Sequence, residues 1–123
     1  MEKIVEQGIL YDFYGALLTN HQQKIYEAVV YDNMSLGEIA EEAGVSRQAV
    51  HDIIKRCDKI LGEYEEKLGL IDRFMATKSY LGELESEANK LDSSAEVIKI
   101  KEIISKLHGV HALGNAVDNI GKT

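Results

Sequence analysis

Apolar residues recur every three or four positions along most of this chain, a spacing that places them on one face of an α-helix. The longest run extends from Ser46 to Lys67. Its apolar residues are Val50, Ile53, Ile54, Cys57, Ile60, Leu61 and Tyr64, followed by Leu68. The run predicts one long helix whose stripe packs against other helices. Gly69 is its expected end, because glycine readily adopts the left-handed conformation that closes many helices.

Capping boxes predict where three other helices begin. In this motif a serine or threonine is followed three residues later by glutamate or glutamine, and the two residues satisfy free backbone N–H groups. The pairs are Thr19 with Gln22, Ser35 with Glu38, and Ser93 with Glu96. With a helix over Ile4 to Leu18 and another for which Asp72 is a candidate cap, the chain is expected to form about six helices.

The apolar positions also predict which side chains these helices bury. The first helix has a wide stripe, which suits burial on more than one side or a dimer face. The residues of that stripe are Ile4, Val5, Ile9, Leu10, Phe13, Tyr14, Leu17 and Leu18. Toward the C-terminus, the expected inward residues are Phe74, Met75, Leu81, Leu84, Ala88 and Leu91 on one helix and Val97, Ile100, Ile104 and Leu107 on the next.

The composition supports an all-α fold. The 123 residues include no proline, a residue that is common in loops and breaks helices. We expect a helix-turn-helix head over residues 1–68, and a C-terminal helical hairpin and tail over residues 69–123 with the tail frayed after His108. No apolar run approaches the ~20 residues of a membrane span, and the N-terminus lacks the features of a secretion signal. One cysteine without a disulfide partner fits the cytoplasm.

The segment from Leu36 to Ile53 has the spacing of a helix-turn-helix motif. Two short helices that cross closely need a small residue in the first helix, which Ala40 supplies, and a flexible turn, which Gly44 supplies. Ser46 is placed to cap the second helix. The apolar residues expected to hold the two helices together are Leu36, Ile39, Val45, Val50 and Ile53.

The second helix of this motif presents polar residues on the side opposite its apolar stripe. Arg47 and Gln48 fall in its first turn, and these side chain types can pair with guanine and adenine edges in the major groove. Ser46, at the helix N-terminus, is a candidate phosphate ligand. Residues further along suit contacts to bases or to the DNA backbone: His51, Lys55, Arg56 and Lys59. DNA is therefore the predicted partner.

The charge distribution leaves a second interpretation open. The formal net charge is −7, whereas non-specific DNA binding depends on Lys and Arg. Basic character is confined to Ser46–Lys59, where four basic and two acidic residues give a net charge of +2. Asp52 lies on the same face and repels phosphate. A helix-turn-helix core can equally contact a protein or RNA, so both kinds of partner remain candidates.

Other chemistry is predicted to be absent. Cys57 falls on the apolar stripe and is expected to be a small core residue. His108 and His111, with Asp118 as a loose third ligand, form a poor metal site and are better explained as polar tail residues. The aromatic residues Tyr11, Phe13 and Tyr14 could stack on RNA bases, although their helical spacing favours the core. We expect neither enzymatic activity nor a cofactor.

A homodimer is expected from the amount of apolar surface. One copy of a chain this short has difficulty covering the stripes of residues 4–18 and 71–91, and the C-terminal hairpin is the candidate dimerisation element.

The segment from Ala16 to Cys57 resembles the fourth region of bacterial sigma factors, with "LTNHQ" at its start and "SLGEIAEEAGVSRQAV" at its core. With "LYDFYGALLT" before it and "YEEKLGL" after it, the chain resembles the YlxM family of small bacterial proteins. The resemblance covers Leu10 to about Leu70 and implies major-groove contacts by Arg47, Gln48, His51 and Lys55. Genes of that family tend to lie beside those of the signal recognition particle GTPases. The resemblance therefore implies a role in that protein-targeting pathway, with its GTPase or RNA as a partner.

Overall fold

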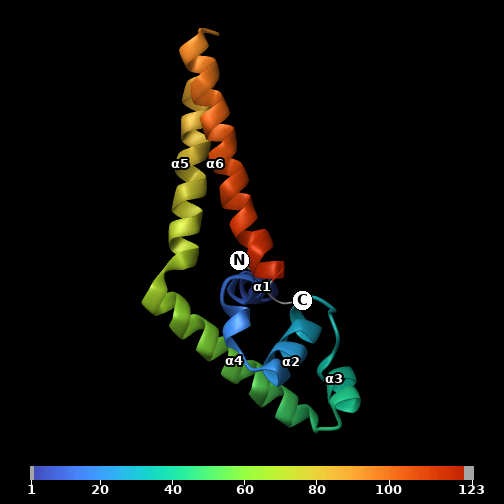
Figure 1. The fold of residues 1–123 in the computed structure, drawn as a ribbon. Helices are drawn as coiled ribbons and strands as arrows, with labels where there is room; N and C mark the ends of the chain where they lie inside the picture. The colour runs from blue at the N-terminus through green and yellow to red at the C-terminus, as the bar shows by residue number, and fades with distance from the viewer. Residues whose placement is uncertain (1, 121–123) are drawn as a thin grey trace. The chain divides into compact units, whose positions relative to one another are not determined.

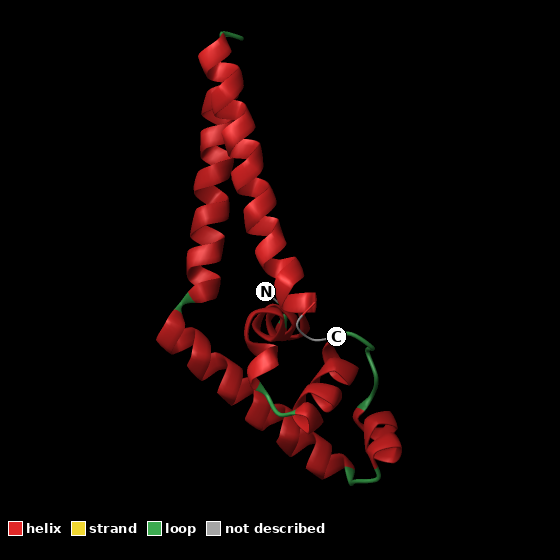
Figure 2. Cartoon of the chain, in the orientation of Figure 1, coloured by secondary structure: helices red, strands yellow, loops and turns green. Residues whose placement is uncertain are grey.

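The structure is a computed structural model that describes residues 2–120, with side chains described for residues 2–111. Figure 1 shows the order of its helices along the chain, and Figure 2 shows helices and loops without a strand in the described part. The elements are α1 (Lys3–Tyr14), a 3-10 turn (Gly15–Leu17), α2 (Asn20–Val30), α3 (Leu36–Ala43), α4 (Arg47–Leu68), α5 (Leu70–Asn89) and α6 (Ala95–Ile120). The predicted all-α fold is confirmed. None of the described helices combines the length and apolarity that a membrane crossing requires.

The chain divides into two compact units at the boundary between Gly69 and Leu70. The head unit contains α1 to α4, and the hairpin unit contains α5 and α6. Gly69 itself closes α4 with a φ of 63°, in the left-handed region, so the predicted helix end is confirmed. Because each unit has its own internal contacts, each is described by itself.

Local sequence signals fix most helix ends in the head unit. Thr19 Oγ1 accepts the Gln22 backbone N–H at 3.2 Å while the Gln22 side chain accepts the Thr19 N–H at 3.0 Å. Ser35 and Glu38 form the same reciprocal pair at 3.1 Å in both directions. Both predicted capping boxes are therefore present.

Two predicted helix starts in the hairpin unit are wrong, by one residue for α6 and by three residues for α5. Helix α6 begins at Ala95, and Ser94 rather than Ser93 precedes it, with Ser94 Oγ accepting the Val97 N–H at 3.3 Å. The third residue of α6 is then Val97, which has no polar side chain to complete a capping box. Helix α5 begins at Leu70, directly after the glycine end of α4, so Asp72 lies inside its first turn.

The core of the head unit is built around tyrosines. Tyr11, Tyr14 and Tyr26 are each at most 1% exposed. Their phenol groups donate to carboxylates on neighbouring helices: Tyr11 to Glu27 at 2.8 Å, Tyr14 to Glu65 at 2.5 Å and Tyr26 to Asp58 at 2.5 Å. Buried polar groups need such partners. These three bonds join α1 to α2, α1 to α4 and α2 to α4.

The predicted inward stripe of α1 is partly wrong. The buried residues of this segment are Gln7, Tyr11, Tyr14, Gly15 and Leu18, whereas Ile4, Val5 and Leu17 are 40–57% exposed. The tyrosines give the physical reason, because their rings fill the space between helices and their hydroxyl groups reach carboxylates on the far side. Tyr14 and Leu18 of the predicted stripe are buried, whereas Gln7 and Tyr11 are buried although they are not part of that stripe.

The hairpin unit packs α5 and α6 along a seam with a spacing of seven residues. Leu81 and Ala88 on α5 and Val97 and Ile104 on α6 are its buried apolar side chains. The expected inward residues Met75, Leu84, Leu91, Ile100 and Leu107 are instead 41–57% exposed. The predicted fraying after His108 is also wrong for the backbone, since α6 continues to Ile120. A glycine inside a helix costs only about 1 kcal/mol relative to alanine, so Gly109 does not end it.

Candidate nucleic-acid interface

Helices α3 and α4 form the helix-turn-helix that the sequence predicts. Gly44 ends α3 with a φ of 71°, a left-handed conformation that suits glycine, and the Val45 N–H donates to the Ala40 carbonyl at 3.1 Å. Ala40, Ile39 and Val50 are 6%, 3% and 0% exposed. The small Ala40 thus lies at the close crossing, as expected.

Two of the five apolar residues expected to hold the motif together lie nearer the surface. Leu36 is 37% exposed and Val45 is 38% exposed, so the prediction of a buried turn residue at Val45 is wrong. Ile54, which belongs to the predicted apolar stripe of the long helix, is 9% exposed and packs in the core as expected.

Ser46 positions the start of α4. Its hydroxyl oxygen accepts the Ala49 backbone N–H at 3.0 Å, which is the predicted cap. The hydroxyl proton is not used in that bond. The N-terminal N–H groups of α4 point away from the helix body and carry the positive end of the helix dipole. This end of α4 is therefore suited to an anionic ligand such as phosphate.

Arg47 lies against the backbone of α3. A Cβ atom placed on Gly37 would come within 2.9 Å of an Arg47 guanidinium nitrogen. The absence of a side chain at Gly37 therefore makes room for the guanidinium group. Arg47 is nevertheless exposed, so its polar edge remains accessible. Sequence reasoning selected Arg47 but missed Gly37, whose signal was only a glycine inside a short helix.

Gln48 and Asp52 form a pair on the exposed side of α4. Gln48 Nε2 donates to Asp52 Oδ1 at 2.9 Å, one helical turn away. His51 Nδ1 lies 3.8 Å from the same carboxylate oxygen, and the Asp52 side chain is 66% exposed. The structure thus places two of the predicted site residues, Gln48 and His51, beside the negative charge of Asp52. Asp52 competes with a DNA base for the Gln48 amide.

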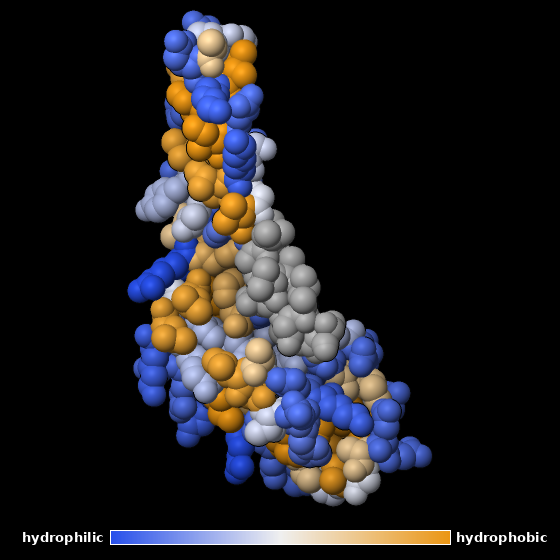
Figure 3. Space-filling model, viewed as in Figure 1, coloured by the Kyte–Doolittle hydropathy of each residue, from blue (hydrophilic) through white to orange (hydrophobic). Residues whose placement is uncertain are grey.

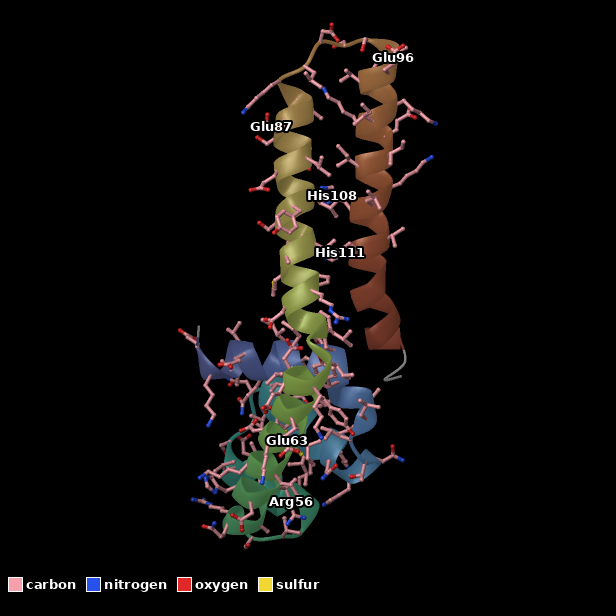
Figure 4. The ribbon with its side chains drawn as sticks, turned by 90° about the vertical axis from the view of Figure 1, so that its left-hand side faces the viewer. Arg56, Glu63, Glu87, Glu96, His108 and His111 are labelled. Carbon is pink, nitrogen blue, oxygen red and sulfur yellow. The ribbon has the colours of Figure 1, made fainter. Side chains whose placement is uncertain are left out.

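The basic side chains continue along α4 beyond this pair. Lys55, Arg56 and Lys59 are all exposed, and Figure 4 places Arg56 on the N-terminal half of α4 and Glu63 farther along. The acids of α3 are exposed as well, at Glu38, Glu41 and Glu42. Hydrogen bonds from Ser35 lower the pKa of Glu38, which keeps this carboxylate charged. The basic surface is consequently narrow and has an acidic helix beside it.

Among the residues whose side chains are described, the other candidate groups do not form a second site. Cys57 is fully buried, and burial raises the pKa of its thiol to about 11, as expected for a core cysteine. His108 Nε2 lies 3.0 Å from Glu85 Oε2, whereas His111 stacks on Phe74 with ring centroids 3.9 Å apart. Both histidines project from α6 toward α5 in Figure 4. The Asp118 side chain lies outside the described residues, and within them no cluster of three metal-binding side chains occurs.

The α3–Gly44–α4 geometry and the exposed polar side of α4 define a helix-turn-helix protein. The chain belongs to the family described as "Putative helix-turn-helix protein, YlxM / p13 like", whose model matches residues 1–103. The predicted YlxM resemblance is thereby confirmed.

Relatives of this family match over most of their length. UPF0122 protein BH2485 of Halalkalibacterium halodurans is 42% identical over 107 residues, which cover 87% of this chain and 98% of the relative. UPF0122 protein YlxM of Bacillus subtilis is 41% identical over 87% of this chain and 97% of its own. A UPF0122 protein of Acetivibrio thermocellus is 38% identical over 87% of this chain and 92% of its own.

Proposed function

We propose that this chain is a DNA-binding regulatory protein of the bacterial cytoplasm, without catalytic activity of its own. The observation that supports this function best is the exposed polar side of the N-terminal half of α4, which follows the helix-turn-helix turn and carries Arg47. A helix in this position can enter the major groove with its first residues against base edges.

Each of the six predicted DNA-binding residues has a role in this proposal. Arg47 binds a guanine through its guanidinium edge, and Gln48 pairs with an adenine once it exchanges Asp52 for the base. Ser46 and the α4 N-terminus bind one phosphate. Lys55 and Arg56 contact the DNA backbone about two turns further along α4. His51 lies between these backbone contacts and the base contacts of the first turn.

The charge of this surface predicts a modest affinity for one copy. About three phosphate contacts correspond to a slope of roughly −2.7 for log K against log salt. A measurement of this slope therefore tests how many lysine and arginine side chains of α4 contact DNA phosphates.

Replacement of Arg47 by alanine is expected to weaken specific DNA binding about ten- to hundredfold. One bidentate arginine–guanine contact contributes about 1–3 kcal/mol to discrimination between bases. Fluorescence anisotropy with a duplex from the promoter of the protein's own gene, beside a random duplex of equal length, measures the change. The loss should be confined to the specific duplex.

Two further variants test the Arg47 result. Arg73→Ala removes an exposed arginine of α5 and should leave DNA affinity unchanged. Asp52→Asn removes the negative charge beside Gln48 and should tighten binding to both duplexes. Equal affinities of the native chain for both duplexes at low salt, or an Arg47→Ala variant that binds normally, would contradict the proposed function.

A second candidate is a role as accessory factor of the signal recognition particle that binds its protein or RNA. Two observations favour it: the Asp52 carboxylate on the presumed DNA face and the exposed acids Glu41 and Glu42 on α3. An acidic surface suits a basic protein partner, and the family's gene neighbourhood favours this pathway.

Co-purification with the particle's purified GTPase and RNA tests this second role. If the acids of α3 bind the GTPase, Glu41→Lys with Glu42→Lys should abolish retention, while Arg47→Ala should not. If neither component is retained in low salt, the second role is wrong.

A further inference from the structure

The hairpin unit leaves large apolar side chains uncovered on both of its helices. Apart from Ile98, seven of them are 45–68% exposed: Tyr80 and Leu84 on α5, Leu91 two residues after its end, and Ile100, Ile103, Leu107 and Val110 on α6. Figure 3 shows orange apolar side chains exposed along the hairpin. Contiguous apolar patches of this kind mark interaction sites more often than scattered single residues do. We call these seven side chains the hairpin face.

The six of these residues that belong to α5 and α6 lie on one side of the hairpin because of their positions relative to the seam. On α5, Tyr80 lies one residue before the buried Leu81, and Leu84 lies three residues after it. On α6, Ile103 and Leu107 have the same two offsets from the buried Ile104. Each residue turns a helix by about 100°, so both offsets point to the same flank of the seam. An antiparallel pair is related by a two-fold axis normal to its plane, and equal offsets therefore fall on the same face.

The opposite side of the hairpin is mostly polar or small. There α5 carries Ser79, Gly82 and Ser86, and α6 carries Glu102 and Ser105. Two large apolar residues are exposed on that side, Ile98 on α6 at 50% and Met75 on α5 at 41%, near opposite ends of the hairpin. The hairpin therefore has one apolar face and not an apolar surface all round, and Ile98 offers a matched control for substitutions.

We propose that a second copy of this chain covers the hairpin face, and that the two hairpins form a four-helix bundle. The spacing of three and four residues from Ile100 to Val110 is the pattern by which helices pack in such bundles. This stretch is about 15 Å long, at a rise of 1.5 Å per residue. A flat face of two helices is complementary to itself, as a two-fold interface requires.

The charges at the edges of the face indicate how two hairpins pair, with α5 of one copy either on α6 or on α5 of the other. Glu83 precedes Leu84 on α5, whereas Lys99 and Lys106 precede Ile100 and Leu107 on α6. A residue that precedes a residue of the hairpin face is rotated about 100° further away from the seam. These charges therefore lie at the edges of α5 and α6 that are farthest from the seam. Figure 4 shows Glu87 on the side of α5 that faces away from α6. The edge of α5 therefore carries Glu83 and Glu87, and Glu87 also pairs with Lys90 at 3.0 Å. The edge of α6 carries Lys99 and Lys106, and Lys99 also pairs with Glu102 at 3.9 Å.

Opposite charges meet only if α5 of one copy lies on α6 of the other. The contacts Phe74–His111 and Glu85–His108 fix the register of the hairpin. At that register Glu83 and Glu87 lie level with the part of α6 that includes Lys106 and Lys99. A two-fold axis parallel to the helices preserves these levels, whereas pairing α5 with α5 would bring like charges together.

The mass of the native chain in solution is the first test. Sedimentation at tens of micromolar should give twice the monomer mass of 13.7 kDa. Ile103→Glu should raise the dissociation constant of the dimer at least tenfold, and Ile98→Glu, at a similarly exposed residue on the opposite side, should not change it. Circular dichroism of each variant checks that both remain helical.

Charge reversals test the pairing of the helices without altering the apolar face. The variant Glu83→Lys/Glu87→Lys and the variant Lys99→Glu/Lys106→Glu should each dissociate about tenfold more readily. All four substitutions in one chain should restore the native dissociation constant.

A monomeric native chain would overturn the proposal, because some other partner would then have to cover the face. Equal effects of Ile98→Glu and Ile103→Glu would also overturn it, as would a fourfold variant that stays dissociated. DNA binding is a separate outcome, since none of these substitutions lies in α4 and the Arg47→Ala test does not depend on them.

Discussion

Replacing Asp58 by alanine is expected to destabilise the head unit by about 3 kcal/mol. Asp58 Oδ1 accepts the Tyr26 phenol at 2.5 Å and the Gln7 side-chain amide at 2.9 Å. Tyr26 is fully buried and Gln7 is 8% exposed, so neither donor can turn to water when the carboxylate is removed. Each buried donor left without a partner costs about 1–3 kcal/mol. Urea denaturation followed by circular dichroism measures the loss.

The location of Asp58 explains why this loss should exceed that of an ordinary hydrogen bond. Gln7 lies on α1, Tyr26 on α2 and Asp58 on α4, so one carboxylate joins three helices. Asp58→Asn keeps an acceptor oxygen and should lose much less stability.

Asp52→Ala provides the matched control for this prediction. It removes an exposed carboxylate of the same helix and should change stability by less than about 0.5 kcal/mol. Equal losses at Asp52 and Asp58 would show that helix α4 is sensitive to any lost acid and that the three-helix junction contributes nothing.

The helix-turn-helix could be predicted from the sequence because its determinants are local. Ser35, Gly44 and Ser46 each act within four residues along the chain, through a cap or a left-handed backbone. Such signals do not depend on what packs against the motif. The capping boxes of α2 and α3 were predictable for the same reason.

The buried faces of α1, α5 and α6 could not be predicted equally well, because they depend on neighbouring helices. In α6 two stripes have nearly the same heptad spacing, one through Val97 and Ile104 and one through Ile100 and Leu107. The sequence merges them into one wide stripe. Only the packing of α5 against α6 shows which stripe is covered.

The candidate site was predictable in its residues but not in its contacts. The exposed positions of α4 follow from the helical period once Val50 and Ile54 are buried. The bond from Gln48 to Asp52 and the position of Arg47 over Gly37 depend on side-chain conformations. Those two contacts decide how readily α4 can exchange an internal partner for a nucleic acid.

Alkaline pH is expected to destabilise the head unit by about 3 kcal/mol or more between pH 8 and pH 11. Burial is the main cause that raises the pKa of the Tyr11 and Tyr26 phenols, with a smaller contribution from hydrogen bonds to Glu27 and Asp58. Both phenols therefore stay protonated in the folded chain above pH 10, where the unfolded chain ionises. Burial likewise raises the pKa of the Cys57 thiol from 9.0 to about 11.

The direction of this change in stability with pH follows from which state, folded or unfolded, binds more protons. The folded state holds these protons more tightly, so its extra stability is complete below the unfolded pKa values and falls as pH rises past them. The loss begins near pH 9 with Cys57 and steepens above pH 10, approaching about 1.4 kcal/mol per pH unit for each buried phenol. Urea midpoints at pH 8 and pH 11 measure it.

Tyr26→Phe isolates one phenol from all other groups that titrate at high pH. The variant lacks the Tyr26 proton but keeps the lysines and the remaining tyrosines, so those groups cancel when its pH dependence is compared with that of the native chain. Between pH 8 and pH 11 it should lose about 1.4 kcal/mol less than the native chain. Identical pH dependence of the two chains would mean that Tyr26 ionises as readily when folded as when unfolded. The burial of Tyr26 against Asp58 makes that result incompatible with a closed head unit.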